Sequence, residues 1–412
     1  MAKPKLQLVI DTGNTNTRVG VKLSGETSVR ETSFELPNTF ATIPDEEQVK
    51  AVINSGDYNN ITSSVYFVDL PHIHRKLRGV VASGEIAETN YSKFLRHPLT
   101  TRAKYESNLV YMAIIKAIDH TLQWATQFSK SGKSKSGIAN SFDIDLTLLV
   151  PPIQATKAQE VYPKALMGIQ GDGLKRPIRY RDLISGEDMA VTINSVNVLP
   201  EGLTAYFAIT ASYEKRAPRP EYADLSQRRV ILLDIGGGTS DIVALNKGQL
   251  MASTQHTIRV GGNDIVTRTR VKFNTQNETN LSEEFFSNVA SDPVIHVGDS
   301  TYDVSDLVGI AKDEVVQNIV SEIQDFFVSQ NIDLNSFERL LIVGGGALAG
   351  ESGESISELI LDDIQDFIPE ITLVDTSKVK EPSIGEDGLD FSSPRNFNLL
   401  GGMIVASLKS GK

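Results

Sequence analysis

One pattern occurs twice in the sequence, once in each half, and it limits the possible folds more than any other feature. The first copy is LQLVIDTGNTNTRVGVKLSG (Leu6 to Gly25), and the second is ILLDIGGGTSDIVALNKG (Ile231 to Gly248). In each copy an apolar run ends in an aspartate, a loop of small polar residues follows, and a second apolar run leads to a turn glycine 14 residues after the aspartate. Each copy predicts a β-hairpin, and the pair predicts two related domains that face each other.

The remaining segments alternate between strand and helix patterns. At 412 residues the chain is too long for one ordinary core, so two domains are expected. The order of the elements predicts layered α/β domains. The expected elements are helices over 106–128 and 306–330, strands over 142–156 and 339–350, a strand, Pro-Glu-Gly turn and helix start over 191–209, a proline-rich connector over 214–229, and a glycine turn leading into a helix over 397–410.

Composition excludes several classes of function. The chain has no cysteine, which removes disulfides, thiolate catalysis and cysteine-ligated metals. His72 and His74 are better interpreted as part of an exposed polar segment than as metal ligands. The net charge of −12 argues against direct nonspecific DNA binding by the folded body. The apolar run at the start is too short to span a membrane, so we expect a cytoplasmic protein with no membrane partner.

A basic stretch from Ser129 to Ser141 contains SGKS, which is similar to the end of a phosphate-binding P-loop. That motif requires a glycine five residues before Gly132, where Gln127 stands, and no strand leads into it. A flexible, solvated loop is therefore the favoured interpretation.

The two hairpin loops suit the binding of phosphate. Successive backbone N–H groups without bulky side chains can surround phosphate oxygens. Asp11 and Asp234, at the strand ends, would repel phosphates unless a divalent cation intervened, and Mg²⁺ suits carboxylates that hold its water shell. Either loop alone is equally well explained as a structural turn, but the matched pair and a third glycine loop favour a shared polyphosphate site.

Five segments together resemble the nucleotide-binding signature of the actin, sugar-kinase and heat-shock chaperone ATPase superfamily. They are LVIDTGNTNTRVGV, VNVLPEGLTAYFA, ILLDIGGGTSDIVAL, LLIVGGGALAG and NLLGGMIVAS. In order, they are similar to its first phosphate loop, first connecting helix, second phosphate loop, adenosine loop and second connecting helix. The chain looks most like bacterial actin-like plasmid-segregation proteins of the ParM type. The resemblance implies two related actin-like (ribonuclease H-like) α/β domains with a nucleotide cleft between them, formed by residues 1–200 with 396–412 and by residues 201–395.

The resemblance also implies roles for individual residues. Asp11 and Asp234 would hold Mg²⁺ through water, and Glu201 would orient the attacking water as the third catalytic residue. Taken alone, Glu201 could instead complement a helix dipole. The backbone positions implied to bind ATP are Gly13, Asn14, Thr15, Gly236, Gly237, Gly238 and Thr239 at the phosphates, and Gly344, Gly345, Gly346 and Ala347 at the ribose and adenine.

The activity that the resemblance implies is Mg-ATP binding, ATP hydrolysis and head-to-tail assembly into filaments. Its implied partners are further copies of the chain and a DNA-binding adaptor protein that links the filament to plasmid DNA. The first loop is poorer in glycine than the second, and no lysine is obviously placed beside it as in actin.

Four alternatives remain. A small-molecule kinase of the same superfamily would need a sugar-specific motif, and we find none. A dinucleotide site could use Gly344, Gly346 and Ala349, with Asp362 or Asp366 on the ribose, but it leaves both hairpins and Glu201 unexplained. A chaperone ATPase would need a peptide-binding domain, for which we expect no room after Lys412. A membrane-bound filament of the MreB type would need an amphipathic or apolar anchor, which the start of the chain does not resemble.

Overall fold

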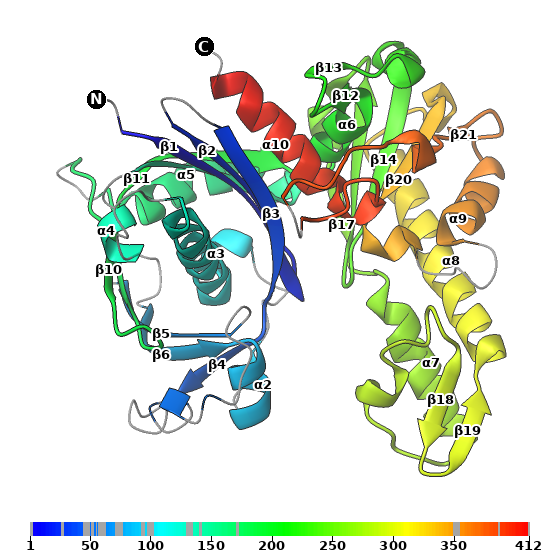
Figure 1. The fold of residues 1–412 in the computed structure, drawn as a ribbon. Helices are drawn as coiled ribbons and strands as arrows, with labels where there is room; N and C mark the ends of the chain where they lie inside the picture. The colour runs from blue at the N-terminus through cyan, green and yellow to red at the C-terminus, as the bar shows by residue number, and fades with distance from the viewer. Residues whose placement is uncertain are drawn as a thin grey trace.

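The computed structural model describes most of the chain, in two halves that lie side by side (Figure 1). His72 and His74 fall outside the described residues. The described residues are 3–25, 29–43, 50, 53–54, 56, 63–70, 77–91, 95–96, 103–128, 135–139, 142–169, 173–348, 355–385 and 388–410.

The first half contains a five-stranded sheet that begins with the first hairpin. Its strands are β1 (Lys5–Thr12), β2 (Asn16–Ser24), β3 (Val29–Pro37), β8 (Asp143–Val150) and β11 (Ile193–Pro200), in the order β11-β8-β1-β2-β3. The first three strands are antiparallel, and β8 and β11 continue the sheet parallel to β1.

The second half repeats this topology. Its strands are β14 (Arg229–Ile235), β15 (Ser240–Asn246), β16 (Gln249–Leu250), β17 (His256–Ile258), β20 (Arg339–Val343) and β21 (Thr372–Leu373). β14 and β15 form an antiparallel hairpin, β16 and β17 pair with β15, and β20 and β21 extend the sheet in parallel from β14. Both predicted hairpins are confirmed, and each leads into a sheet of the same connectivity.

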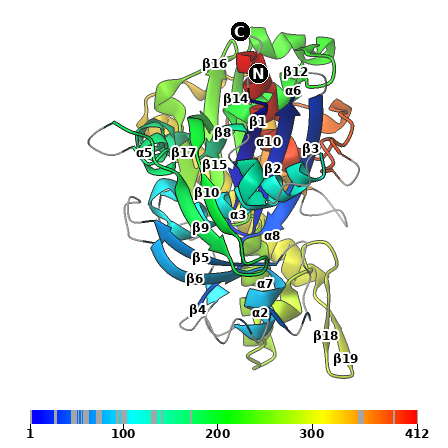
Figure 2. The ribbon, with the colours of Figure 1, turned by 60° about the vertical axis from the view of Figure 1, so that its left-hand side comes forward.

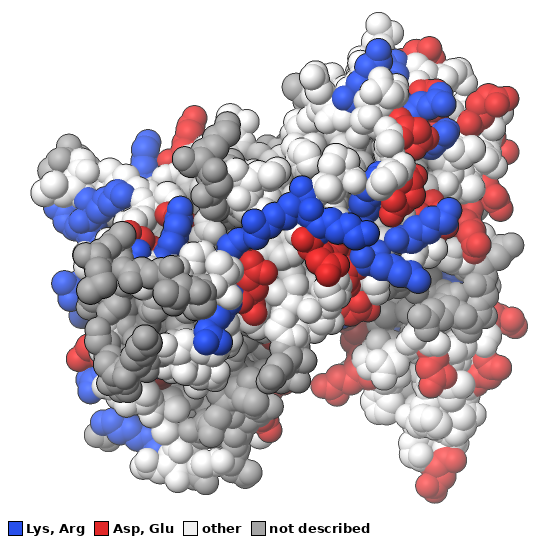
Figure 3. Space-filling model, turned by 45° about the horizontal axis from the view of Figure 1, so that its top comes forward, with Lys and Arg blue, Asp and Glu red and all other residues white. Residues whose placement is uncertain are grey.

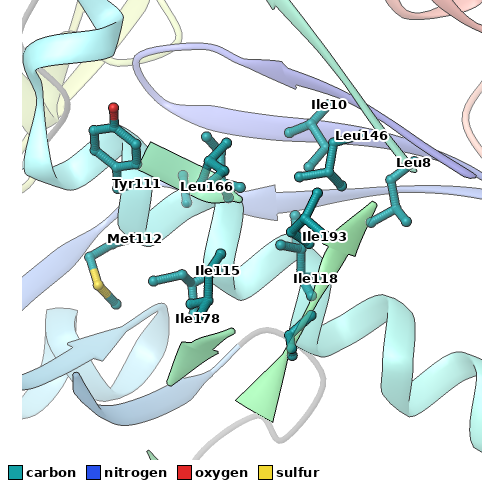
Figure 4. Packing of buried hydrophobic residues seen from close by; sticks show 14 of the residues in the cluster. Leu8, Ile10, Tyr111, Met112, Ile115, Ile118, Leu146, Leu166, Ile178 and Ile193 are labelled. Atoms are coloured by element: carbon teal, nitrogen blue, oxygen red, sulfur yellow. The ribbon is translucent and has the colours of Figure 1, made fainter. Parts of the chain in front are cut away.

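Helix α3 (Asn108–Thr126) lies between the first sheet and a second, six-stranded sheet in the same half (Figure 1). Side chains from both sheets, such as Ile10 and Ile178, pack near this helix (Figure 4). Because the helix is apolar on nearly all sides, the core is its only favourable place. The strands of this sheet are β10 (Asp188–Val191), β9 (Ile178–Asp182), β5 (Ser64–Leu70), β6 (Leu77–Ser83), β4 (Phe40–Ile43) and β7 (Leu95–Arg96), in that order.

Shorter elements cover the sheets. The hairpin of β18 (Val294–Val297) and β19 (Ser300–Asp303) projects from the second half (Figure 2). The other helices and strands are α2 (Glu85–Asn90), α4 (Lys135–Ala139), α5 (Ala155–Leu166), α6 (Leu203–Thr210), α7 (Asn263–Gln276), α8 (Ser305–Ser329), α9 (Ile356–Gln365), α10 (Phe397–Ser410), β12 (Ala211–Ser212) and β13 (Ala217–Pro218). The 3₁₀ helices are η2 (Lys104–Glu106), η3 (Pro152–Gln154), η4 (Pro220–Gln227), η5 (Ala252–Thr254), η6 (Glu283–Phe286), η7 (Leu334–Ser336), η8 (Gly345–Leu348), η9 (Thr376–Lys378) and η10 (Pro394–Asn396).

Helices α6 and α10 join the two halves. One apolar cluster combines Val9 and Leu149 of the first sheet with Leu232 and Leu341 of the second, and both helices contribute to it. The glycine turn predicted at the start of 397–410 is wrong, because Gly401 and its neighbour lie inside α10. A side chain at Gly401 would lie 1.6 Å from the carbonyl oxygen of Thr204 in α6, so the glycine is needed for close helix contact rather than for a turn.

The basic stretch from 129 to 141 is also corrected in part. Its residues 135–139 form α4 rather than a solvated loop. Lys135 is buried, and its Nζ lies 3.1 Å from Asp119 Oδ2 and 2.5 Å from Asp182 Oδ2. The carboxylates of Asp119 and Asp182 make this burial possible by compensating the charge of the lysine. Both lie far from Lys135 in the sequence, so the local sequence does not predict the burial.

Substitution of Gly401 tests the helix contact. Gly401→Ala should lower the free energy of unfolding by about 3 kcal/mol, because α6 and α10 must separate. Gly309→Ala in α8 is the matched control, since nothing lies within 4 Å of its added methyl group, and it should raise stability by about 0.5–1 kcal/mol. Urea denaturation measures both, and equal effects would contradict this account of the contact.

Lys116 gives the fold a pH dependence. This residue of α3 is 2% exposed, donates from Nζ to the carbonyl oxygen of Pro37 at 3.0 Å, and burial lowers its pKa to about 7. Between pH 7 and about 10.4 the unfolded chain therefore binds more protons at this position than the folded chain, so its contribution to stability rises with pH.

Lys116→Met removes the buried amine. The variant should be more stable than the wild type at pH 6, where the lysine is charged, and this advantage should shrink as the pH approaches 10. Urea denaturation at several pH values measures the difference. A difference that does not change with pH would show that Lys116 does not titrate in this range.

Candidate functional site

The ends of the two hairpins present different pairs of charges at equivalent positions. Asp11 pairs across the strands with Arg18, whereas Asp234 pairs with Asp241. Side chains of directly paired residues share one face of a sheet. Nη1 of Arg18 lies 3.5 Å from Asp11 Oδ2. The first hairpin therefore carries a compensated charge, and the second carries two like charges.

The two hairpin loops have the same local geometry. The N–H of Gly13 donates to the carbonyl oxygen of Asn16 at 2.9 Å, and the N–H of Gly236 donates to that of Thr239 at 2.8 Å. A Cβ atom on Gly13 would meet the Asn16 carbonyl oxygen at 2.9 Å, so this turn leaves little room for a side chain. The loops are thus two copies of one turn, each at the end of a buried strand.

Glu201 follows β11 and is buried against a lysine. Its backbone N–H donates to the carbonyl oxygen of Val150 at 2.8 Å, which fixes the turn between β11 and α6. Nζ of Lys104, from η2, donates to Glu201 Oε1 at 2.6 Å. Burial lowers the pKa of Lys104, but attraction to Glu201 and then to Asp11 outweighs it and raises the pKa overall, so this lysine is positively charged at neutral pH.

Three carboxyl groups of the site, those of Glu201, Asp234 and Asp241, have raised pKa values. Burial raises the pKa of Glu201 to about 8, against the attraction of Lys104, and the charges of Asp11 and Asp241 add to the increase. Burial and then Asp241 raise the pKa of Asp234 to about 7. Burial also raises the pKa of Asp241. Four carboxyl groups therefore interact where the two halves meet, and removing them from water is costly unless cations compensate.

Asn398 connects Asp234 to the turn that carries Glu201. Its Nδ2 donates to Asp234 Oδ2 at 2.5 Å, and its Oδ1 accepts from the Gly202 N–H at 2.9 Å and from Thr204 Oγ1 at 3.0 Å. One side chain at the start of α10 thus holds the second hairpin against the junction of β11 and α6.

The third glycine loop packs directly on the second. A Cβ on Gly344, which has a φ of 93°, would lie 2.4 Å from Asp234 Oδ1, and one on Gly346 would lie 2.4 Å from Ile235 Cγ2. Gly345 is exposed, whereas Ala347 is buried in the core of the second half. The close contact explains why glycine is needed at 344 and 346.

Charged side chains also join the halves near this loop. One face of the molecule carries a band of basic side chains with acidic side chains beside it (Figure 3). Glu35 of β3 lies 3.4 Å from Nε of Arg18 and accepts from Nη2 of Arg395 at 2.5 Å. The aliphatic part of Arg395 lies beside Gly345. This series connects the first hairpin to the third glycine loop.

The structure brings the sequence-predicted residues Asp11, Glu201 and Asp234 together with both hairpin loops, and it places the loop of 344–346 against the second. It adds four residues that the sequence analysis missed: Arg18, Lys104, Asp241 and Asn398. Cross-strand pairing of the two repeats could have indicated Arg18 and Asp241, seven residues after each aspartate. Lys104 and Asn398 reach the site only through tertiary contacts.

Among the described residues, no group of three His, Cys, Asp or Glu side chains is arranged to bind a metal directly. The carboxyl groups do fit a hydrated cation, because burial first and repulsion from neighbouring carboxyl groups second raise the pKa of Glu201 and Asp234, and a cation would offset both effects. Within the same described part of the chain, no helix is long and apolar enough to cross a membrane.

The fold matches solved structures of actin homologues over nearly the whole chain. A crystal structure of an archaeal actin homologue covers 98% of this chain and 99% of its own, at 14% identity and a TM-score of 0.62, and the same protein in complex with ADP gives 0.61 over the same shares, also at 14% identity. Bacillus thuringiensis ParM with ATP covers 99% and 100%, at 14% identity and a TM-score of 0.57. A 15-stranded ParM filament from Clostridium botulinum covers 98% of this chain and 99% of its own, at 15% identity and a TM-score of 0.58.

A sequence model of the C-terminal part of archaeal MreB-like actin homologues matches residues 232–352, which run from β14 to the third glycine loop. No curated protein matches the sequence significantly. The chain has the two-domain actin-like fold, so the predicted fold class is confirmed. The ParM proteins that the sequence resembles are among the structures that share it.

Removal of Asn398 tests its linking role. Asn398→Ala removes the partner of Asp234 Oδ2 and of the Gly202 N–H, while Thr204 Oγ1 keeps its 3.4 Å bond to the carbonyl oxygen of Pro200, so the free energy of unfolding should fall by about 2–3 kcal/mol. Leu408→Ala, at a 63% exposed position of the same helix, should change it by less than about 0.5 kcal/mol. Similar values for the two variants in chemical denaturation would show that the link contributes little.

Proposed function

We propose that the protein is an actin-like ATPase that binds Mg-ATP between its two halves, assembles into filaments and hydrolyses ATP. The proposed domains are residues 1–200 with 396–412 and residues 201–395. The observation that carries the proposal is that Asp11 and Asp234, which end equivalent hairpin strands of the two sheets, interact within one cluster of buried carboxyl groups. Structural relatives solved with ADP and with ATP support a nucleotide as the ligand.

Each group in the site has a chemical role in this proposal. The backbone at Gly13, Asn14 and Thr15 and at 236–239 binds the phosphates, and 344–347 borders the ribose and adenine. Asp11 and Asp234 hold water molecules of Mg²⁺. When bound, the ion neutralises phosphate charge. Arg18 and Lys104 supply further positive charge beside the first loop.

Glu201 positions and deprotonates the attacking water. A general base works best with a pKa near the operating pH, and burial raises the pKa of Glu201 to about 8. In this proposal, Lys104 holds the carboxylate in place through the 2.6 Å contact.

Filament formation is the proposed purpose of hydrolysis. ATP closes the two domains and favours subunit addition, and hydrolysis weakens the lattice. The ParM filament from Clostridium botulinum supports assembly into filaments, for which we propose a head-to-tail arrangement. The charge difference between the proposed domains is compatible with contacts between unlike domains of neighbouring copies, because residues 1–200 with 396–412 carry 25 basic and 20 acidic side chains, whereas 201–395 carry 15 and 32. Plasmid segregation in a bacterial cytoplasm, through a DNA-binding adaptor, completes the proposal.

Replacement of Glu201 separates binding from hydrolysis. Glu201→Gln should slow phosphate release by about 100-fold or more, because the general base is lost, and should leave longer-lived filaments. Phosphate release, light scattering and electron microscopy with ATP, ADP and no nucleotide measure these effects. Glu160→Gln, at an exposed ion pair with Lys157, is the control and should behave as the wild type. Unchanged hydrolysis in the Glu201 variant would remove it from the catalytic groups.

The same assays distinguish the alternative of a small-molecule kinase. A kinase would consume ATP without assembling at any concentration, and an acceptor sugar would stimulate its turnover. That result would replace the filament proposal.

A further inference from the structure

Asn38 lies directly behind the first loop, and we infer that it is a positioning residue which turns the Gly13–Asn14 peptide for phosphate binding. The inference rests on the proposed function, because it concerns how the same loop recognises phosphate. Asn38 follows β3 immediately and is completely buried.

Three hydrogen bonds connect Asn38 to the loop. Its Nδ2 donates to the carbonyl oxygen of Gly13 at 2.6 Å, and its Oδ1 accepts from Thr17 Oγ1 at 2.7 Å. Its backbone N–H donates to the carbonyl oxygen of Thr15 at 2.7 Å. The orientation of the side-chain amide is determined, because a carbonyl oxygen can only accept and Nδ2 must therefore face Gly13.

The bond to Gly13 determines where the next N–H points. In a planar trans peptide, the C=O of one residue and the N–H of the following residue point in opposite directions. The Gly13 carbonyl points inward to the buried Asn38, so the Asn14 N–H points outward. Gly13 and Asn14 are partly exposed and Thr15 is exposed, which places this N–H on the accessible side of the loop.

The second loop is held in the same way by different atoms. The N–H groups of Gly262 and Asn263 donate to the carbonyl oxygens of Gly236 and Gly237 at 2.9 and 2.7 Å. By the same peptide geometry, the N–H groups of Gly237 and Gly238 point away from this support. Gly262 and Asn263 come after β17, which pairs with the second strand of its hairpin, and Asn38 comes after β3, which pairs with the second strand of the other hairpin. In both repeats the support therefore comes from the segment that follows this third strand.

The two supports differ in one useful respect. Backbone atoms hold the second loop, whereas a side chain holds Gly13 in the first, which is poorer in glycine. Preorganised N–H donors bind anions without paying to reorient. Loss of the Asn38 amide should therefore weaken recognition of phosphate groups and leave recognition of the nucleoside unchanged.

Binding of ATP, ADP and adenosine to three variants of the full chain tests this role. Asn38→Ala should weaken ATP and ADP binding about tenfold relative to adenosine, which corresponds to about 1.4 kcal/mol. Asn38→Asp is close in size but faces the Gly13 carbonyl with a second acceptor, so it should lose at least as much. Thr17→Val keeps the bond to Gly13 and should lose less. Isothermal titration calorimetry, with competition for adenosine, gives the three ratios.

Three outcomes are informative. A selective loss for ATP and ADP in the order Asp, Ala, Val supports the inference, because a merely structural role would weaken all three ligands alike. Unchanged ratios, or equal losses with adenosine, overturn it while the proposed function stands. If the wild type binds neither ATP nor ADP, the proposed function fails and this inference fails with it. If the Asn38 variants do not fold, the affinity ratio measured for Thr17→Val decides. A selective loss of less than about tenfold for ATP and ADP supports the inference. An unchanged ratio, or a loss of more than about tenfold, contradicts it.

Discussion

The rest of the structure depends on the charge at the ends of two buried strands. Asp11 and Asp234 end equivalent strands of the two sheets, and Glu201 and Asp241 join them in a region shielded from water. Burial raises the pKa values of Glu201, Asp234 and Asp241, and repulsion from neighbouring carboxyl groups adds to the increase for Glu201 and Asp234. Arg18 and Lys104 are positive groups that face this cluster and compensate part of its charge.

The joint between the halves lets the site form from distant parts of the chain. Helices α6 and α10 approach so closely that Gly401 has no room for a side chain, and Asn398 then reaches both Asp234 and the Gly202 N–H. The crossing of these helices therefore fixes the relation between the second hairpin and the turn that carries Glu201. The sequence pattern of Gly401 and Gly402 suggests a turn, but both glycines lie inside α10. They allow close packing of this helix where the two halves are in contact.

Internal duplication explains both the symmetry of the site and its departures from symmetry. The two hairpins share one turn and one register, yet Arg18 in the first corresponds to Asp241 in the second. The supports behind the loops have also diverged, with the Asn38 side chain in one and backbone N–H groups in the other. The two loops share one backbone turn, while the charges beside them differ.

The sequence alone determined the two hairpins, the order of the main strands and helices and the residue types that end each strand, because these depend on local periodicity and on glycine. The actin-like fold class followed from the resemblance of five segments to a known superfamily. The roles assigned to Asp11, Glu201 and Asp234 stay predictions. Only the tertiary structure decided that Lys104 pairs with Glu201, that Asn398 bridges to Asp234, that Lys135 is buried and that Gly401 lies inside a helix. Each of these depends on partners distant in the chain, and a pattern along one strand or helix carries no information about which remote group will neutralise a buried charge or fill a contact.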